Sequence, residues 1–476
     1  MADETVRLVK EKAFNISKMK KFISLRLLFV PALLLLISAG TMPRNLFPEA
    51  ERYKLANGLE VIFADYGELP VTSVTFFINV GKKSETPGQQ GLSSLTANSL
   101  VLGSDKYNRV ELDRLLYRTG GEISASSNKN FTVLNGQFLN KNMETGMEIL
   151  SSVLLHPSFP QQDIDEQKNF ELSQNTPSKM DISVLADVYG EYFTYGAEHP
   201  LGRHYYEAQY KKITVAQIKE FYNFNFTPGN TKLVVTGKPD HELMKKLIEA
   251  KFGSWRSDFD AVNGSSYEVP PIKTKAYAFI AKEDATQACI EWFKKAPAAG
   301  SKDVAAFLLA NAVFSDHLGN EIREKRGFTY GIYSTFSESQ NDEVFRSRTQ
   351  IRNEVMYETL NAFDQVLVDF NKNGATEKEL NKFKTMLKAD VLSLEEPSSF
   401  AALINPWVYR DYSKRKAYLA ELDAIDIPAL NKVIKKYFTP DSYKVIIAGD
   451  AGMLAEQLGK IKNLEKLSPT VIETPE

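Results

Sequence analysis

The chain carries one sequence pattern twice, at a constant offset. Phe226-Thr227-Pro228 stands before the run 232–237, and Phe438-Thr439-Pro440 stands before the run 444–449. The offset is 212 residues at both ends, because 438 − 226 and 449 − 237 give the same value. A gap-free offset over this length indicates two copies of one structural unit. The apolar positions upstream keep the same offset: Ile213 matches Ile425, Val215 matches Ile427, Ile218 matches Leu430 and Phe221 matches Val433.

Each copy predicts an amphipathic helix, a short turn and a buried strand that ends at a glycine. Thr214 and Gln217 have the spacing of a capping box at the first helix, and Asp426 can cap the second. We therefore expect an α+β protein with two homologous domains, each a mostly antiparallel sheet with helices packed on one face. Helical spacing also occurs at 143–154 and 360–370, strand-like runs occur at 59–64, 71–80, 131–138, 276–280 and 288–293, and Asn57-Gly58 marks a hairpin turn.

The repeat also predicts how the chain is divided. The first domain spans residues 42–256 and the second spans 275–465. Residues 257–274, which are rich in Gly, Ser, Asp and Pro, form a linker. Residues 1–41 precede the first domain, and residues 466–476 form a tail.

The composition describes an ordinary globular protein, with 43% hydrophobic and 25% charged residues. A net charge of -2 argues against a nucleic-acid-binding protein, because such proteins usually carry a basic surface. The single cysteine, Cys289, excludes an internal disulfide bond. Its apolar neighbours indicate a buried structural thiol rather than a reactive one.

The N-terminal region has the pattern of an export signal. Lys20 and Lys21 precede an apolar run from Leu27 to Ile37, and small residues follow at 38–40. The run is too short to span a bilayer comfortably as a finished helix. We therefore expect residues 1–41 to be a signal peptide, with Met19 as an alternative start, and the protein to be exported to the periplasm. The alternative is an uncleaved N-terminal anchor, although no stable membrane anchor is expected.

Common catalytic patterns are absent from the sequence. Its five histidines form no H-E-x-x-H or H-x-x-E-H pair, and the cluster of His199 and His204 lies in a Pro/Gly-broken loop that we interpret as structural. The Gly-Lys-Lys at 81–83 is not a phosphate-binding loop. Ser93 and Ser94 have no visible His or Asp partner, so we interpret them as polar helix residues. Basic residues at 323 and 326, followed by Gly327, fit the end of a helix.

Several motifs together resemble the insulinase-like (pitrilysin, inverzincin) zinc metallopeptidases, over roughly Tyr53 to Ile461. The resemblance implies a peptidase scaffold of the kind in which each chain has two repeats and chains pair. The motifs lie at 57–59, 85–92, 196–203, 226–237 and 318–330.

The zinc helix of this family reads G-L-x-H-x-x-E-H, with two His ligands and a Glu general base. After Gly91-Leu92, this chain has Ser94, Ala97 and Asn98 at those three places. A hydroxyl, a methyl and an amide cannot replace imidazole ligands and a carboxylate base. The third family ligand is a Glu further along, where this chain has 173–175 (Ser-Gln-Asn), with Glu171 as the nearest carboxylate. The resemblance therefore implies that the zinc site is missing, and no cofactor is expected in this chain.

One part of the family's active site is kept. In the family, an Arg and a Tyr seven residues apart bind the substrate backbone and stabilise the oxyanion, and Arg323 and Tyr330 have that spacing. Some relatives divide the site between two chains. The resemblance thus implies a non-zinc subunit of an exported heterodimeric metallopeptidase, whose partner carries H-x-x-E-H and zinc. Peptides would add to a sheet edge at Gly121, Ile123 and Ala125.

Two other interpretations stay open. A scaffold or assembly protein could keep this fold with Arg323 and Tyr330 as relics, and an independent enzyme could use other chemistry. Retention of the pair beside the loss of the metal ligands favours the divided site. We expect no catalysis from this chain alone.

Overall fold

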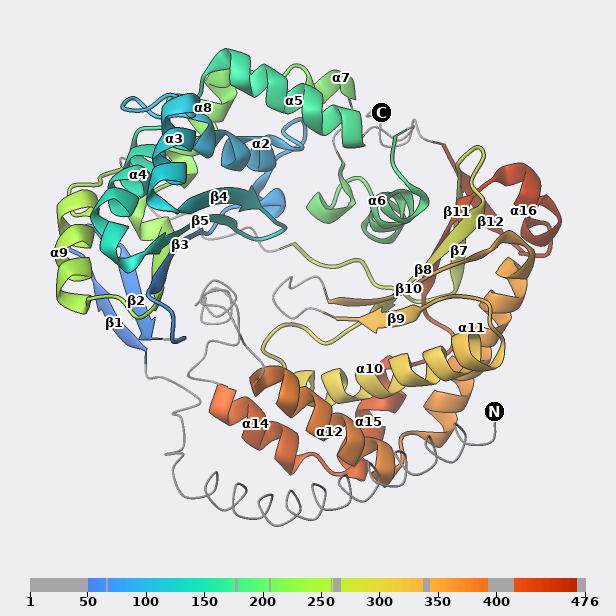
Figure 1. The fold of residues 1–476 in the computed structure, drawn as a ribbon. Coiled ribbons are helices and arrows are strands. Elements are labelled where there is room, and N and C mark those ends of the chain that lie inside the picture. The colour runs from blue at the N-terminus through green and yellow to red at the C-terminus, as the bar shows by residue number, and fades with distance from the viewer. Residues whose placement is uncertain are drawn as a thin grey trace, which may run out of the picture. The chain divides into compact units, whose positions relative to one another are not determined.

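The computed structural model describes residues 50–65, 67–175, 179–204, 207–257, 259, 267–336, 343–392 and 415–468. The predicted signal peptide, most of the predicted tail and residues 258 and 260–266 of the predicted linker lie outside the described residues. The described chain is built on two six-stranded sheets, one in each half (Figure 1). None of the helices in this part of the chain combines the length and the apolar character needed to cross a membrane.

The sheet of the first half has the strand order β1-β2-β6-β3-β5-β4. Its strands are β1 (Glu51–Lys54), β2 (Glu60–Asp65), β3 (Val71–Ile78), β4 (Glu122–Ser127), β5 (Thr132–Leu139) and β6 (Thr231–Gly237). The helices of the first half of the chain are α2 (Leu92–Ser99), α3 (Arg109–Thr119), α4 (Met143–Leu155), α5 (Gln161–Asn175), α6 (Ile182–Tyr195), α7 (Glu207–Tyr210), α8 (Val215–Asn225) and α9 (His241–Phe252). Short 3-10 helices are η1 (Lys82–Ser84), η2 (Leu100–Leu102), η3 (Asn140–Asn142), η4 (Pro200–Gly202) and η5 (Pro228–Asn230).

The sheet of the second half has the strand order β12-β7-β11-β8-β10-β9. Its strands are β7 (Ala276–Ala281), β8 (Gln287–Lys295), β9 (Ile332–Thr335), β10 (Val344–Arg352), β11 (Lys444–Gly449) and β12 (Leu464–Leu467). The helices are α10 (Val304–Leu318), the π-helical η6 (Gly319–Lys325), η8 (Asn353–Val355), α11 (Met356–Asn373), α12 (Glu377–Leu392), α14 (Arg415–Ala424), α15 (Ile427–Tyr437) and α16 (Ala451–Leu458).

The predicted duplication is confirmed in the arrangement of the elements. Helices α8 and α15 differ by the same 212-residue shift at both ends, and β6 and β11 end at the matched glycines 237 and 449. In each sheet the repeated strand is central: β6 is parallel to β2 and antiparallel to β3, and β11 is parallel to β7 and antiparallel to β8. The capping box is formed as well, because the Gln217 N–H donates to Thr214 Oγ1 at 3.3 Å and the Thr214 N–H donates to Gln217 Oε1 at 2.9 Å.

The predicted α+β class with two mostly antiparallel sheets is also confirmed. In the first sheet only the β2–β6 pair is parallel, and in the second only β7–β11 and β7–β12 are parallel. The hairpin at Asn57-Gly58 joins β1 to β2, where Gly58 has a φ of +98° that favours glycine.

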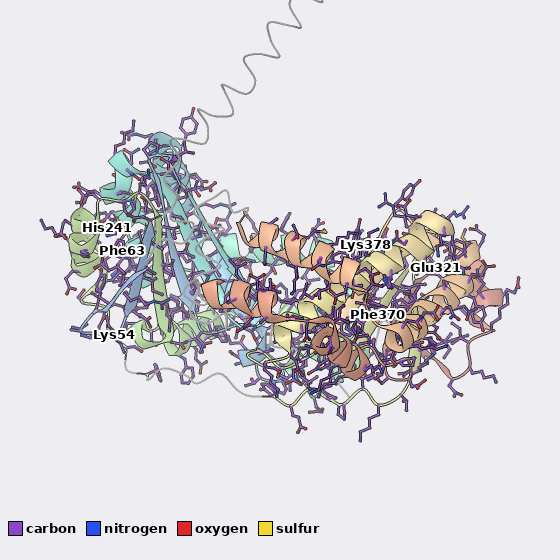
Figure 2. All side chains as sticks on the ribbon, turned by 90° about the horizontal axis from the view of Figure 1, so that it is seen from below. Lys54, Phe63, His241, Glu321, Phe370 and Lys378 are labelled. Carbon is purple, nitrogen blue, oxygen red and sulfur yellow. The ribbon has the colours of Figure 1, made fainter. Side chains whose placement is uncertain are left out.

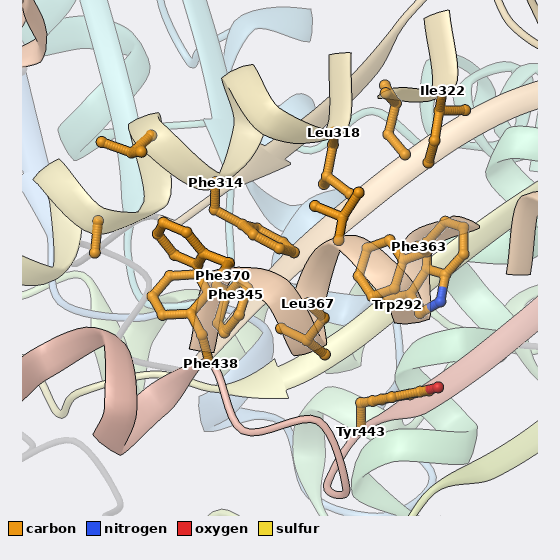
Figure 3. Packing of buried hydrophobic residues seen from close by; sticks show 14 of the residues in the cluster. Trp292, Phe314, Leu318, Ile322, Phe345, Phe363, Leu367, Phe370, Phe438 and Tyr443 are labelled. Atoms are coloured by element: carbon orange, nitrogen blue, oxygen red, sulfur yellow. The ribbon is translucent and has the colours of Figure 1, made fainter. Parts of the chain in front are cut away.

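Each half has its own apolar core. In the second half, the Trp292 ring of β8 stacks on Phe363 of α11 at 4.1 Å between centroids, and Phe314 of α10 lies 5.1 Å from Phe438 (Figure 3). In the first half, Phe63 of β2 is buried and stacks on His241 at the start of α9, at 4.8 Å (Figure 2). Burial of one such aromatic side chain contributes about 1.5–3 kcal/mol to stability.

Helix α6 joins the two halves, which belong to one compact unit. It follows α5 in the first half but packs against β7, β8 and β11 of the second sheet. Gly190 allows this close approach, since an added Cβ would lie 2.5 Å from the Phe293 ring. Lys444 of β11 donates to the Phe193 carbonyl at 2.5 Å and to the Thr194 carbonyl at 3.2 Å. The second sheet therefore has helices on both faces, and the sequence did not predict this additional layer.

Candidate functional site

The three zinc-motif positions lie together on α2. Ser94 and Asn98 are one helical turn apart and half-buried, so they share a face of the helix. Ala97 is fully buried against the core. The face that would present two imidazoles in the family thus presents a hydroxyl and an amide.

A buried carboxylate fixes the start of this helix. Glu85 Oε1 accepts hydrogen bonds from the Ser93 N–H at 2.8 Å and the Ser93 hydroxyl at 2.7 Å, and Oε2 accepts one from the Gly91 N–H at 3.1 Å. Burial raises the pKa of Glu85. Because the first N–H groups of a helix lack helical partners, a carboxylate at this place stabilises the helix start. Glu85 therefore holds the start of α2 in place.

The second group that faces α2 is Glu171 of α5. Its Oε1 accepts from Asn98 Nδ2 at 2.7 Å and from Gln167 Nε2 at 2.9 Å, and its Oε2 accepts from the Tyr210 hydroxyl. Glu171 is only 9% exposed. In the window that the sequence analysis assigned to the third family ligand, Ser173 and Gln174 are exposed. The carboxylate that reaches the α2 face is thus Glu171 rather than a residue of that window.

This set of groups does not fit a zinc ion. Zinc prefers nitrogen and sulfur ligands together with carboxylates, whereas α2 offers Ser94 and Asn98. Both oxygens of Glu171 already accept hydrogen bonds from neighbouring side chains. In the part of the chain that the structure describes, no group of three or more His, Cys, Asp or Glu side chains could hold a metal ion.

The loop with two histidines is packed as a structural element. His199 is 7% exposed, its Nδ1 accepts a hydrogen bond from the Leu201 N–H at 3.1 Å, and its ring stacks on Tyr195 at 5.0 Å. Burial, with the nearby Lys and Arg charges, lowers the pKa of His199 to about 4. A neutral, packed imidazole supports the interpretation of this loop as structural.

Arg323 and Tyr330 lie on the segment between α10 and β9. Arg323 belongs to η6, and the Gly327 N–H ends this helix by donating to the Arg323 carbonyl at 3.0 Å, with a φ of +63° at Gly327. This is the helix end that the sequence predicted, although in π-helical form. The exposed Arg323 side chain pairs with its neighbour Glu324 at 3.4 Å. Tyr330 is 93% exposed.

The two side chains line neighbouring cavities. Tyr330 lines a cavity of about 810 Å³, the strand-face cavity, whose walls include Tyr333 and Arg348. Arg323 lines a second cavity of about 540 Å³, which also contacts Tyr333 and Gly331. The described contacts include none between the Arg323 and Tyr330 side chains. The structure therefore places the two side chains at neighbouring cavities that share Gly331, Tyr333, Thr335 and Phe336.

The two sheets end in edge strands that differ. β4, which follows Gly121 and carries Ile123 and Ala125, is the last strand of the first sheet and, among the described strands, pairs only with β5. β9 is the last strand of the second sheet, but its Ser334 N–H donates to Ser315 Oγ at 3.1 Å and its Ser334 carbonyl accepts from Asn311 Nδ2 at 2.9 Å. Side chains of α10 thus occupy the outer edge of β9, and no such bond to β4 occurs among the described residues.

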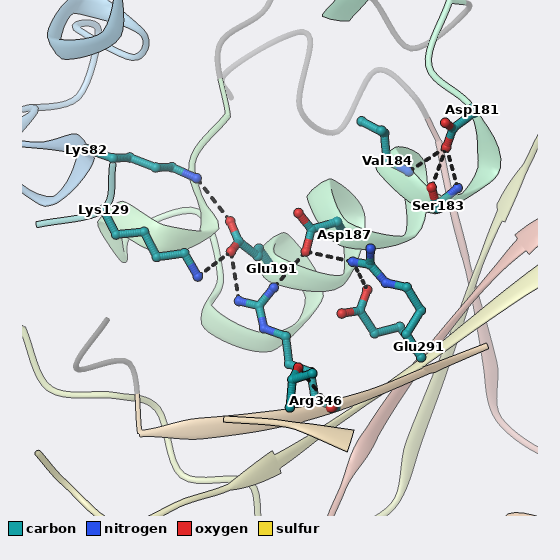
Figure 4. Close-up of polar contacts among 11 residues, drawn as sticks. Lys82, Lys129, Asp181, Ser183, Val184, Asp187, Glu191, Glu291 and Arg346 are labelled. Atoms are coloured by element: carbon teal, nitrogen blue, oxygen red, sulfur yellow. Dashed lines mark hydrogen bonds and ion pairs between the residues drawn. The ribbon is translucent and has the colours of Figure 1, made fainter. Parts of the chain in front are cut away.

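A cluster of charged residues lies at the strand-face cavity (Figure 4). Glu191 of α6 pairs with Lys82 at 3.1 Å, Lys129 at 2.7 Å and Arg346 at 2.8 Å. Burial alone raises the pKa of Glu191, but the three cations outweigh it and hold the pKa well below its usual value. Arg346 also pairs with Asp187 at 2.7 Å. No motif in the sequence indicated this cluster.

Its second part is centred on Arg348 of β10. Nη2 of Arg348 contacts Glu291 at 3.0 Å and Asp187 at 3.1 Å. Glu291 is 1% exposed, and burial raises its pKa to about 7 against the opposing charge of Arg348. The charged form of Glu291 thus depends on its arginine partner.

Replacement of Glu291 by Gln tests this burial. The pKa of the carboxyl rises from 4.5 to about 7 on folding, so between these values the folded protein keeps a proton that the unfolded chain has released. The stabilisation from this proton is complete below pH 4.5 and is lost as the pH rises to 7, by roughly 3 kcal/mol. We expect the unfolding free energy of the wild type, measured relative to that of Glu291→Gln by denaturant titration, to fall by this amount between pH 4.5 and pH 7. A pH-independent difference would contradict it.

Two family models match the chain. The model for "Insulinase (Peptidase family M16)" matches residues 63–188, and the model for "Peptidase M16 inactive domain" matches residues 212–387. The chain is similar to the zinc protease PqqE of Helicobacter pylori, with 24% identity over 440 residues that cover 88% of this chain and 97% of that protein. It is also similar to the uncharacterized zinc protease YmxG of Bacillus subtilis, with 20% identity over 420 residues that cover 85% and 99%.

Solved structures share the fold. A peptidase M16 inactive domain from Pseudomonas fluorescens superposes with a TM-score of 0.76 at 21% identity, covering 84% of this chain and 98% of that one. The periplasmic protease PqqL from Escherichia coli gives a TM-score of 0.72 at 17% identity, covering 87% of this chain but 47% of that one. Models of one family thus match both halves of the duplicated fold, and the protein belongs to the insulinase (peptidase M16) family.

Proposed function

We propose that this chain is the non-zinc subunit of an exported, two-chain insulinase-family peptidase that cleaves peptides or unfolded polypeptides. The observation that carries the proposal is the state of α2: its ligand face holds Ser94 and Asn98, yet Glu85 and Glu171 keep that face ordered. An ordered α2 face that lacks the metal ligands is what we expect of a chain whose partner subunit supplies the metal. Zinc and the general base would come from a partner with H-x-x-E-H.

The match to PqqL supports the need for a second unit. This chain covers 47% of that periplasmic protease, so the protease contains about as much chain again. A partner subunit would supply the corresponding part here. The periplasmic location of PqqL and the signal-like segment before the first domain both support export.

This chain's own contribution to catalysis would come from two side chains. The exposed Tyr330 hydroxyl would donate a hydrogen bond to the oxyanion that forms at the scissile carbonyl, and Arg323 would hold the peptide backbone. The outer edge of β4 would pair with the main chain of the peptide. The occupied edge of β9 supports this choice between the two sheets, because α10 side chains already bind its Ser334.

Substitution of Arg323 tests the proposal in the assembled complex. Arg323→Ala should lower kcat/KM about 10- to 100-fold, because a charge-assisted hydrogen bond to the substrate is worth about 1.5–3 kcal/mol. Arg326→Ala is the matched control: Arg326 is also exposed and lies three residues away, but it pairs with Glu321 at 3.0 Å. Equal activity of both variants would remove Arg323 from the proposed site.

One observation favours a second candidate, a scaffold or assembly protein without a catalytic role. Arg323 pairs with its own neighbour Glu324 and lines a different cavity from Tyr330, as relic residues could. On this account neither Arg323→Ala nor any change at Tyr330 alters the turnover of a complex that contains the chain.

A further inference from the structure

The strand-face cavity contains charged groups that the proposed function does not use. At about 810 Å³ it falls within the range of ligand sites, roughly 300–1,000 Å³. Tyr330 lies at this cavity, so a peptide that reaches Tyr330 would also meet its walls. The charged residues that line it are Lys129, Asp187, Glu191, Glu291, Arg346 and Arg348.

Arg348 is a charged group in this cavity whose described contacts leave hydrogen-bond donors unused. Tyr333, Arg348 and Glu291 form one row across β9, β10 and β8, so their side chains share a face of the sheet. Arg348 is 40% exposed and meets Glu291 and Asp187 through Nη2 alone. In the described part of the chain, no partner contacts its Nε or Nη1. A guanidinium with open N–H groups is suited to a carboxylate.

The charged cluster as a whole carries a small excess of positive charge. Its cations are Lys82, Lys129, Arg346 and Arg348, and its carboxylates are Asp187, Glu191 and Glu291, two of which pair with Arg348 itself. A local excess of one sign in a partly buried site attracts the opposite sign. The exposed rings of Tyr330 and Tyr333 add apolar surface beside it, which a free inorganic anion would not need.

We propose that the strand-face cavity binds a carboxylate of a peptide through Nε and Nη1 of Arg348, with Tyr330 and Tyr333 against the adjoining residues. The carboxylate is that of an acidic side chain or of the peptide C-terminus. The inference rests on the proposed function, since it names a feature of the substrate that the same site selects.

Four peptides test the proposal by direct binding to the chain alone. They have one fluorescently labelled sequence with either Glu or Gln at its centre and either a free or an amidated C-terminus. Fluorescence anisotropy should show about 10- to 100-fold tighter binding for the peptides with the recognised carboxylate. If the tighter binding follows the central Glu, the bound carboxylate is that of an acidic side chain. If it follows the free C-terminus, the bound carboxylate is that of the chain end.

Variants then assign the effect to Arg348. Arg348→Gln should remove the gain, whereas Arg352→Gln should keep it, because Arg352 is on the same strand and face but does not line the cavity. If Arg348→Gln leaves Glu291 buried without its partner and unfolds the protein, the double variant Glu291→Gln with Arg348→Gln replaces it. Asp187→Asn should tighten binding about 3- to 10-fold, because it removes a carboxylate that competes for Arg348.

Equal affinities for the four peptides, or a gain that survives loss of Arg348 in the folded double variant, would overturn the proposal. These binding results are independent of a zinc-bearing partner. If Tyr330 and Arg323 prove irrelevant to turnover while Arg348 still selects the carboxylate, the proposed function fails and the binding site stands.

Discussion

Ser94→His combined with Asn98→His is expected to give this chain a zinc site that the wild type lacks. The two positions share a face of α2 at a spacing of one turn, the arrangement by which a helix presents two imidazoles to one metal ion. The carboxylate of Glu171 lies 2.7 Å from the Asn98 amide and would be the third ligand. Three such ligands and a water complete a tetrahedral site.

The expected zinc dissociation constant is micromolar or lower, which corresponds to about 8 kcal/mol, with no stoichiometric binding by the wild type in the same competition assay. Ser94→His alone is the control, since one imidazole and a carboxylate make a weak site. Tyr210→Phe in the double-histidine background should lower the affinity about 10- to 100-fold, because the Tyr210 hydroxyl orients Glu171. If the double-histidine protein folds but binds no more zinc than the control, the described geometry of α2 and α5 is wrong.

Tyr330→Phe is expected to lower turnover by the assembled peptidase about 10- to 1000-fold, or roughly 1.4–4 kcal/mol of transition-state stabilisation. The substitution removes one hydroxyl, the proposed donor to the oxyanion, and leaves the ring in place. Because the side chain is 93% exposed, the unfolding free energy should change by less than about 0.5 kcal/mol. The measurement is kcat and KM of the complex with wild-type and variant subunits.

Tyr117→Phe is the matched control for this prediction. Tyr117 of α3 is 90% exposed, lines neither of the two cavities and has no proposed role at the oxyanion. We expect its loss of a hydroxyl to leave kcat unchanged. A similar loss of activity in both variants would indicate an effect unrelated to the oxyanion, and no loss in Tyr330→Phe would remove the tyrosine from catalysis.

The duplication and most of its elements could be predicted because their signals are local. The apolar spacing and the Thr214–Gln217 capping box indicate helix α8, and the same spacing recurs 212 residues later in α15. Positions 94 and 98 could be placed on one helical face through the family resemblance, which matches them to the two His of the zinc helix. Helical period and capping act within a few residues, so one sequence is enough to read them.

The layer formed by α6 could not be predicted, because it depends on contacts between distant parts of the chain. Nothing within residues 182–195 indicates that this helix packs on a sheet whose strands begin at Ala276. Gly190 was the available signal, but a glycine inside a helix has several uses, and its close contact with Phe293 exists only in the folded chain.

The charged cluster and the role of Glu171 were missed for a related reason. Glu191, Lys82, Lys129 and Arg346 come from separate elements, so no short motif contains them. Glu171 is the nearest carboxylate to the window 173–175, but which face of α5 turns toward α2 depends on how the two helices pack.

The most direct test of the divided active site is to isolate the native protein from its source under mild conditions and identify any stoichiometric partner by mass spectrometry. Our account predicts a partner of similar size that carries H-x-x-E-H, and one zinc ion per pair of chains. A homodimer, or a stable complex whose other members have no zinc motif, would contradict the account and leave the chain as a scaffold.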